Sequence, residues 1–334
     1  MNRREFVRRL TLAGTAGLIR LVPSEASAEL PPESPRLRLT QTPVVCVAPQ
    51  YVASELLRAE GFADVQYVKR DGDFQRWQRE VLASGEVDIM TNYVTSLVTQ
   101  IDAGDPIVLL GGVHVGCYEL FGTGNVRAIR DLRGRRVAVP ESPSGQQLFV
   151  SMMAAYVGLD PRKDIEWVIH PATEASTLLA ERKVDALMAF PPQAQELRAK
   201  KIGHVVVASA IDRPWSQYFC CMIAGNKEFV RKNPVATKRA VRAILKASMM
   251  CATEPERAAR LLVDRGFATN YDYSLQMLKD LPYNRWRELD SSDAVRFYAL
   301  RLHELGLIKS DPKKIIAQGT DWRFVNELKK ELKG

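Results

Sequence analysis

The sequence lacks the motifs that mark the common catalytic and cofactor sites. It contains no GxSxG elbow, no HExxH, no GxxxxGKS/T phosphate loop and no GxGxxG that opens a helix after a strand. Only four histidines are present, widely scattered, and none of the five cysteines has the CxxC spacing typical of metal sites. These absences predict a protein that is not an enzyme and that carries neither a cofactor nor a metal ion.

Long hydrophobic runs are also missing. No stretch approaches the ~20 uninterrupted apolar residues that span a bilayer. The charged blocks are short and mixed in sign, although 47 Lys and Arg outnumber 39 Asp and Glu to give a net charge of +8. Such a pattern does not favour binding to nucleic acid. What remains is a globular composition, with 46% hydrophobic and 26% charged residues, in a 334-residue chain that has room for two domains of ~150 residues each.

Residues 1–28 have the order of an export signal. Four arginines within the first nine residues precede an apolar run at 10–19, and Pro23 is followed by the small-residue stretch ASA at 26–28. The NRREFV stretch at 2–7 resembles a twin-arginine signal, which directs folded proteins across the bacterial inner membrane. Cys46, the first cysteine, lies too far along the chain for a lipoprotein signal. We therefore expect cleavage near Ala28 and a soluble periplasmic protein; the alternative is a cytosolic amphipathic helix.

Five cysteines are an odd number for an oxidising compartment, so at least one thiol is unpaired or pairs between molecules. Each lies in an apolar stretch, which favours buried free cysteines, and the sequence leaves their oxidation state open. The neighbours Cys220 and Cys221 are expected to face opposite sides of a strand.

Apolar segments of strand and helix length alternate along the chain. After a proline-rich linker at 29–36, strands are expected at 37–40, 65–68, 87–90 and 107–110, with helices between them. A second unit repeats the pattern, with strands at 136–139, 165–169, 184–189 and 205–208. From about residue 222 the pattern is helical to the end. The order predicts two α/β units with parallel sheets, followed by a helical tail that packs on them.

Polar loops at the carboxyl ends of strands are the candidate binding elements, because helix N-termini supply free N–H donors there. The candidate ligand-binding residues are Thr40, Gln41, Thr42, Thr91, Asn92, Tyr93, His114, Ser142, Ser144, Gly145, Gln146, Phe190, Gln193, Arg213, Trp215 and Tyr218. Simpler roles remain open for several of them. The 91–92 and 140–145 segments suit ordinary helix caps and turns, the 215 and 218 aromatics could close a hinge, and the histidine could be a satisfied core residue.

Five segments in order carry a family resemblance: YVASELLRAEGF (51–62), GEVDIMTNYVTSLVTQIDAGDPIVLLGG (85–112), IRDLRGRRVAVPESPSGQQL (129–148), VGLDPRKDIEWV (157–168) and LLAERKVDALMAFPP (178–192). They resemble the periplasmic substrate-binding proteins of ATP-binding-cassette (ABC) importers for nitrate, taurine, aliphatic sulfonates and hydroxymethylpyrimidine-type thiamine precursors. The likeness spans most of residues 37–225.

The resemblance implies a type II periplasmic-binding-protein fold with two lobes joined by two crossover segments. One lobe would comprise residues 37–115 and 211–334, and the other 116–210. It implies a monomer that closes on a small-molecule solute and delivers it to an inner-membrane ABC permease. TPVVCVAPQ (42–50) is bulkier than the family's usual opening, and DRPWSQYFCC (212–221) adds aromatic mass. Both favour a larger organic solute, of sulfonate, pyrimidine or aromatic carboxylate type, over nitrate.

Two alternatives remain open at this stage. A related branch of the family makes a thiamine pyrimidine with iron and a lysine-bound cofactor, and Cys220-Cys221 only faintly resembles its cysteine-rich cluster. An extracytoplasmic sensor subunit would have the same sequence features as a transport protein.

Overall fold

The computed structural model describes residues 29–70 and 74–332, and the side chains of all of these except 74–76. The expected export signal lies outside the described residues. The chain divides into a unit Met1–Pro31 and a compact unit Pro32–Gly334, and only the second is considered below. Within the described ranges, no helix combines the length and apolar character needed to cross a membrane.

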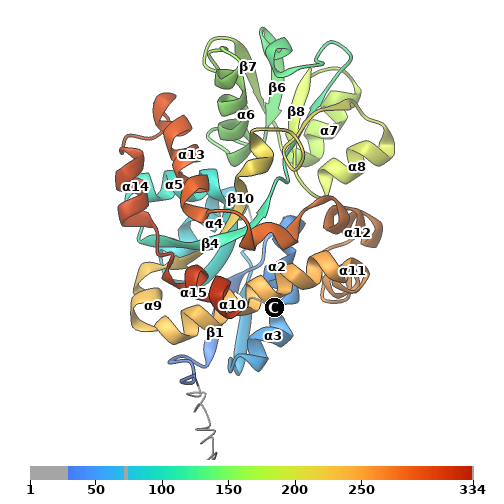
Figure 1. The fold of residues 1–334 in the computed structure, drawn as a ribbon. Helices are drawn as coiled ribbons and strands as arrows, with labels where there is room; N and C mark the ends of the chain where they lie inside the picture. Colours follow the sequence, from blue (N-terminus) through green and yellow to red (C-terminus); the bar gives the residue numbers. More distant parts are fainter. Residues whose placement is uncertain (1–28, 71–73, 333–334) are drawn as a thin grey trace, which may run out of the picture. The chain divides into compact units, whose positions relative to one another are not determined.

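The first sheet contains strands from both ends of the compact unit (Figure 1). Its five strands, in the order β2-β1-β3-β10-β4, are β1 (Arg36–Thr40), β2 (Asp64–Val68), β3 (Ile89–Tyr93), β4 (Ile107–Val115) and β10 (Phe219–Asn226). β1 is parallel to β2 and β3, whereas β10 inserts antiparallel between β3 and β4. β4 and β10 are buried along their whole length. This sheet and its helices are called lobe 1.

The second sheet repeats this arrangement. Its strands, in the order β7-β6-β8-β5-β9, are β5 (Glu119–Gly122), β6 (Arg135–Val139), β7 (Ile165–Ile169), β8 (Ala186–Ala189) and β9 (His204–Ala208). β6 is parallel to β7 and β8, and β5 is antiparallel to β8 and β9. This sheet and its helices are called lobe 2.

The predicted α/β architecture with two lobes is confirmed, but the expectation of purely parallel sheets is wrong. β5 and β10 are the strands by which the chain enters lobe 2 and returns to lobe 1. Each arrives directly from the other lobe without a crossover helix, so each joins its sheet antiparallel to its neighbours. The strand β10 also continues to Asn226, beyond residue 222, where the sequence predicts only helices. The lobe boundaries at 115/116 and 210/211 stay a prediction.

Helices cover both sheets. Lobe 1 carries α2 (Ala48–Val52), α3 (Ser54–Ala59), α4 (Phe74–Ala83) and α5 (Val94–Ala103), and lobe 2 carries α6 (Gly145–Tyr156), α7 (Ala172–Ala180) and α8 (Gln193–Lys200). The C-terminal helices are α9 (Lys227–Lys232), α10 (Pro234–Thr253), α11 (Pro255–Asp264), α12 (Tyr271–Asp280), α13 (Ser291–Glu304), α14 (Pro312–Gly319) and α15 (Arg323–Glu331). Short 3-10 turns lie at η1 (Val45–Val47), η2 (Ile129–Leu132), η3 (Trp215–Gln217) and η4 (Tyr283–Arg287).

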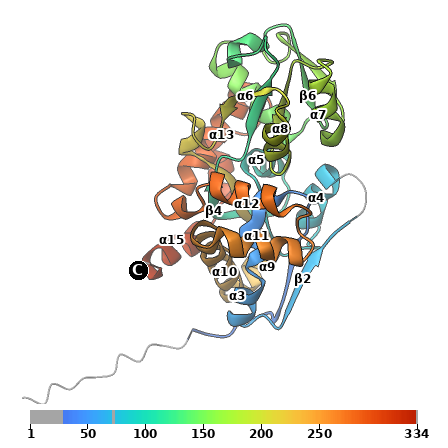
Figure 2. The same ribbon diagram turned by 90° about the vertical axis from the view of Figure 1, so that its right-hand side faces the viewer.

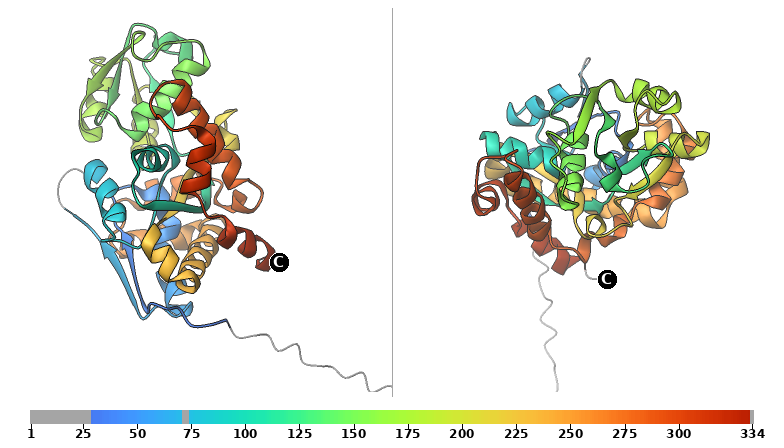
Figure 3. Two further views of the ribbon diagram at one scale, coloured as in Figure 1. Left: turned by 90° about the vertical axis from the view of Figure 1, so that its left-hand side faces the viewer. Right: turned by 90° about the horizontal axis from the view of Figure 1, so that it is seen from above.

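The C-terminal helices contact both lobes. α10 packs on α2, α3 and β4 of lobe 1, and α13 and α14 pack on α5. α13 also reaches α6 of lobe 2, as Figure 3 shows on its left side, and α12 meets α8 in Figures 1 and 2. The tail therefore contributes to the junction between the lobes.

A partly buried ion pair fixes the start of β3 against β1. Asp88 accepts hydrogen bonds from the backbone N–H of Arg38 at 2.7 Å and from its Nε at 3.2 Å. In lobe 2, Asp185 accepts the same two bonds from Arg136, at 3.0 and 3.2 Å. Although partial burial raises the pKa of Asp185, the bonds from Arg136 outweigh this and hold that pKa below its usual value. In both lobes, an aspartate just before the central strand therefore aligns that strand by accepting hydrogen bonds from an arginine on the neighbouring strand.

Candidate functional site

A cavity of about 510 Å³, called cavity A, lies at the carboxyl ends of strands from both sheets. Its described lining comprises Gln41, Thr42 and Pro43 after β1, Lys69 and Arg70 after β2, Pro192 after β8, and Val45, Trp77, Gly266, Phe267, Ala268, Thr269, Asn270 and Ser274. Ligands of open α/β sheets bind at this edge, and the volume lies in the range typical of small-molecule pockets. Cavity A is therefore the leading candidate for a solute site.

The described lining of cavity A contains two cationic side chains and no carboxylate. Arg70 is paired with Glu86 and lies 3.5 Å from Glu80, so its charge is already matched. Trp77 is 5% exposed, and its indole Nε1 has no hydrogen-bond partner among the described residues. Asp71 and Asp73 lie outside the described part of the chain. The described residues thus offer donors and positive charge together with apolar surface.

Gln50 holds the strands behind this cavity in register, and sequence analysis missed it. Its Nε2 donates to the carbonyl oxygen of Thr40 at 2.7 Å and to the Thr40 Oγ1 at 3.3 Å, while its Oε1 accepts from the Thr91 N–H at 2.6 Å. A fully buried glutamine in the helix after β1 therefore joins the carboxyl ends of β1 and β3. Lys69 directly follows the predicted strand at 65–68, so the strand-end rule could have identified it, whereas Trp77 lies within α4, where that rule gives no signal.

A second cavity of about 340 Å³, cavity B, lies at the N-terminus of α6. Ser144 caps this helix by accepting from the Gln147 N–H at 3.2 Å, and it lines the cavity together with Gly145. A Cβ atom on Gly145 would lie 2.8 Å from the Tyr118 Oη and 3.2 Å from the Ser96 Oγ of α5. The glycine therefore permits close contact between α6 of lobe 2 and α5 of lobe 1.

Aromatic side chains close the junction between the lobes. Tyr93 stacks on Tyr118, with ring centroids 4.9 Å apart, and meets the edge of Phe190 at 6.2 Å. Burial raises the pKa of both tyrosines well above the usual value. Among the residues described, the buried polar atoms Thr91 Oγ1, Asn92 Nδ2, Tyr93 Oη, Thr95 Oγ1 and Tyr118 Oη have no hydrogen-bond partner. Each such atom costs about 1–3 kcal/mol while it lacks a partner, so these side chains would gain from a hydrogen bond to a further polar group.

The remaining predicted site residues lie in separate places. Ser142 Oγ donates to the Gln147 Oε1 at 2.9 Å. Gln193 Nε2 donates to the Ala172 carbonyl oxygen at 2.7 Å, and Gln193 and Gln146 both line a small gap of about 10 Å³. Arg213 and Tyr218 line a third cavity of about 260 Å³. Trp215 packs on Phe149 with ring centroids 5.3 Å apart. Of the predicted residues, Gln41 and Thr42 are the ones that line cavity A.

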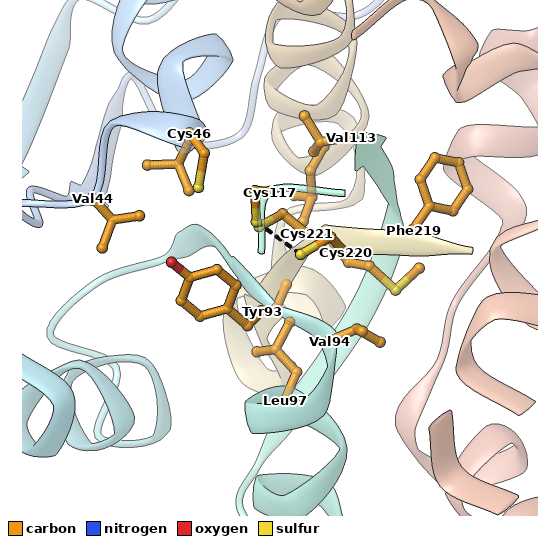
Figure 4. Close-up of a cluster of buried hydrophobic side chains, with 14 of the residues drawn as sticks. Val44, Cys46, Tyr93, Val94, Leu97, Val113, Cys117, Phe219, Cys220 and Cys221 are labelled. Carbon is orange, nitrogen blue, oxygen red and sulfur yellow. Dashed lines mark hydrogen bonds between the residues drawn. The ribbon is translucent and has the colours of Figure 1, made fainter. Parts of the chain in front are cut away.

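His114 lies in a cluster of sulfur atoms. The cluster contains His114 and Cys117 at the end of β4, Cys46 in η1, and Cys220 and Cys221 on β10 (Figure 4). All five cysteines of the chain are buried and free. The neighbours on β10 do not face opposite sides as predicted: Cys220 Sγ lies 2.8 Å from Cys117 Sγ, and Cys221 Sγ lies within 4.8 Å of it. The β10–β4 pairing shifts register on both sides of Cys221, which permits both sulfurs to approach Cys117.

Burial and hydrogen bonding shift the pKa of the Cys46 thiol in opposite directions. Burial alone raises the pKa of the Cys46 thiol, but contacts from Cys117, Cys221 and His114 outweigh it and leave that pKa well below the usual value. Cys251, which lies elsewhere on α10, experiences burial alone, and its pKa is raised.

Two sheets, two direct crossings between them and a cavity at their strand ends define the periplasmic-binding-protein fold. The nitrate-binding protein NrtA from Synechocystis PCC 6803 superimposes with a TM-score of 0.75 at 15% identity, over 91% of this chain and 90% of that chain. The alkanesulfonate-binding protein SsuA from Xanthomonas axonopodis pv. citri, bound to MOPS, gives 0.69 at 14% identity over 87% and 99%. The ligand-binding component of an ABC-type import system from Staphylococcus aureus, with zinc bound, gives 0.70 at 12% over 87% and 98%.

The sequence itself places the chain in a family. The NMT1/THI5-like family matches residues 48–258, and the chain belongs to this family. No curated protein matches the sequence. The likenesses to solved structures are all below 20% identity, so they establish the fold and not the solute.

Proposed function

We propose that the protein is the solute-binding component of an ABC-type importer, and that it binds a small organic anion in cavity A. The anion carries a carboxylate or sulfonate group and an apolar or planar part. The observation that supports this most is the described lining of cavity A, which combines Lys69 and the unpartnered Trp77 Nε1 with the apolar Phe267 and with no carboxylate. An acceptor-rich anion with an apolar body complements that set.

Closure of the lobes would complete the site. Pro192 is contributed to cavity A by lobe 2, and beside it Arg198 of α8 forms ion pairs with Glu119 at 3.0 Å and with Asp280 of α12. Gln195 Nε2 also donates to the Asp280 carboxylate at 3.3 Å. The two contacts to Asp280 bridge the lobes, whereas the Glu119 pair lies within lobe 2. A solute that touches both lobes would favour the closed form by its differential affinity. The closed form would be the state presented to an inner-membrane permease.

The binding role is favoured over catalysis by the same lining. Its described hydroxyls, on Thr42, Thr269 and Ser274, have no histidine, cysteine or carboxylate beside them in the cavity wall. An activated nucleophile requires such a neighbour. We further propose that the protein acts outside the cytoplasm, as a monomer, after removal of residues 1–28.

Two measurements test this function. Native mass spectrometry of protein purified from its own host's periplasm should reveal a bound organic acid. Sulfonates, aromatic carboxylates and pyrimidines should then be screened by thermal melting, because a true ligand at 100 times its Kd stabilises the fold by about 2.7 kcal/mol. We expect carboxylates or sulfonates to raise the melting temperature and neutral pyrimidines not to do so.

Variants locate the site. Lys69→Gln removes the cationic donor and should weaken anion binding by about 10- to 150-fold, the equivalent of ~1.5–3 kcal/mol for a charged hydrogen bond. Trp77→Phe removes a neutral donor and should weaken binding by about 2- to 10-fold. Lys313→Gln, a change at an exposed lysine on α14 that does not line cavity A, is the control. The proposal fails if no anion binds, or if Lys69→Gln binds the anion as tightly as Lys313→Gln does.

A further inference from the structure

Four potential metal ligands converge inside the fold, and none of them lines cavity A. One nitrogen of His114 and the sulfur atoms of Cys46, Cys117 and Cys221 all lie within 4.8 Å of one another, and all four residues are buried. In a tetrahedral site with Zn–S bonds of about 2.3 Å, neighbouring ligand atoms lie about 3.8 Å apart. The four groups are therefore almost at coordination distance. Figure 4 shows the Cys46 and Cys117 sulfurs facing the same gap.

The histidine is already held in the orientation of a metal ligand. Its Nδ1 lies 2.9 Å from the Gly116 carbonyl oxygen and 3.2 Å from that of Val115, so Nδ1 carries the proton and donates it. The other nitrogen, Nε2, is fully buried and has no hydrogen-bond partner in the described part of the chain. Metal-binding histidines show this arrangement, with one nitrogen bonded to a carbonyl and the other bonded to the ion.

We propose that Cys46, Cys117 and Cys221 bind a Zn²⁺ ion as thiolates together with His114 Nε2. Three soft thiolates and one imidazole in tetrahedral array are the donor set that zinc prefers, and four protein ligands make a closed, structural site. With all three cysteines bound as thiolates, the site carries the ion's two positive charges and three thiolate charges. Cys220, whose sulfur contacts Cys117, is a second-layer thiol that donates to the Cys117 sulfur.

The position of the ligands gives the ion a structural role. Cys46 lies in η1, next to cavity A; Cys117 lies in the first crossing between the lobes, and Cys221 lies on β10, just after the second. An ion at this point would tie both crossings to the loop that follows β1. Export of the folded chain, which the N-terminal sequence predicts, would allow the ion to be bound before translocation.

Metal analysis of the full-length chain tests the proposal without any variant. After purification in zinc-containing buffer and exhaustive dialysis, we expect one zinc ion per chain. Replacement by Co²⁺ should produce visible d–d bands and a thiolate-to-cobalt charge-transfer band in the near ultraviolet. A strong chelator should remove the ion and lower the melting temperature. Protein that retains no metal, or that holds iron or copper in place of zinc, overturns the assignment.

Variants and a count of free thiols distinguish the zinc site from the rival arrangement, a disulfide between Cys117 and Cys220. Cys46→Ser and His114→Gln should abolish stoichiometric zinc, whereas Cys220→Ser and the matched control Cys251→Ser should retain it. Denatured, chelator-treated protein should show five reactive thiols per chain. Three reactive thiols, or zinc retained fully by both Cys46→Ser and His114→Gln, would refute the site. If a variant does not fold, the cobalt spectrum of the wild-type protein still decides the result.

Discussion

Gly145→Ala should open the lobes without unfolding them. The added methyl group would lie 2.8 Å from the Tyr118 Oη, 3.2 Å from the Ser96 Oγ and 3.6 Å from the Tyr93 Cδ2. Tyr118 cannot turn aside easily, because its ring lies between Tyr93 and Phe149 with centroids 4.9 Å from each. Overpacking of this kind costs about 1–3 kcal/mol.

The overpacking energy can oppose either closure of the lobes or folding, depending on whether α5 and α6 separate when the lobes open. If α5 and α6 separate when the lobes open, the clash is relieved in the open form and the whole penalty falls on closure. A penalty of 1–3 kcal/mol shifts the closed-to-open ratio by about 5- to 150-fold. Gly145 is the first residue of α6, where alanine is no worse a helix former than glycine, so folding stability should not fall.

Small-angle X-ray scattering and thermal melting separate these effects. Gly124→Ala is the control, since an added Cβ there meets no atom within 4 Å. We expect Gly145→Ala to have a larger radius of gyration than the wild type and Gly124→Ala, with an undiminished melting temperature. An unchanged radius together with a lower melting temperature would show that α5 and α6 belong to one rigid body, and the reasoning would be wrong.

Three further predictions concern ion pairs. Asp88→Asn should reduce the free energy of unfolding in urea by about 1.5–3 kcal/mol, because the 4% exposed Asp88 loses its charged hydrogen bonds from Arg38, whereas Asp185→Asn should cost less because Asp185 and its partner Arg136 are 16% and 39% exposed. The pKa of Asp185 is lower in the folded protein than in the unfolded chain, so the ionised carboxylate stabilises the fold. This stabilisation is fully present above the unfolded pKa of ~3.9 and is lost as the pH falls through the lower pKa of the folded state. Asp185→Asn should therefore flatten the acid limb of the stability curve, and an unchanged limb would contradict this. Asp280→Asn removes a partly exposed ion pair with Arg198, which is worth ~0.5–1 kcal/mol, so it should weaken solute binding by about 2- to 5-fold at low salt. In calorimetric titrations, the difference in affinity from the wild type should shrink at high salt, because salt screens the pair.

The sequence predicts the two α/β lobes because strand and helix periodicities are local properties. It misses β5 and the extent and pairing of β10, since Glu119–Gly122 and Phe219–Asn226 acquire their partners only when the chain crosses between lobes. Their antiparallel pairing depends on a path through space that no local pattern records.

In the candidate site, too, some residues carry a local sequence signal and others are identified only by tertiary packing. Gln41 and Thr42 were predicted by their place after a strand, and Lys69 has the same signal after the strand at 65–68. Trp77 and residues 266–270, in contrast, come from segments brought together by tertiary packing. The sulfur cluster is the extreme case. Cys46, His114, Cys117 and Cys221 come from three separate parts of the chain, so ligand spacing, the only sequence signal for metal sites, could not identify them.

The loop after β1 connects the two proposed sites. Gln41, Thr42, Pro43 and Val45 line cavity A, and the next residue, Cys46, is a zinc ligand. The Tyr283 hydroxyl donates to the Cys46 carbonyl oxygen at 2.7 Å, which helps to hold this turn in place. An ion held there would restrict the loop before solute arrives, and binding to a preorganised loop loses less conformational entropy. The zinc would then favour solute binding without touching the solute, which gives a physical reason for a buried ion beside the hinge of a binding protein.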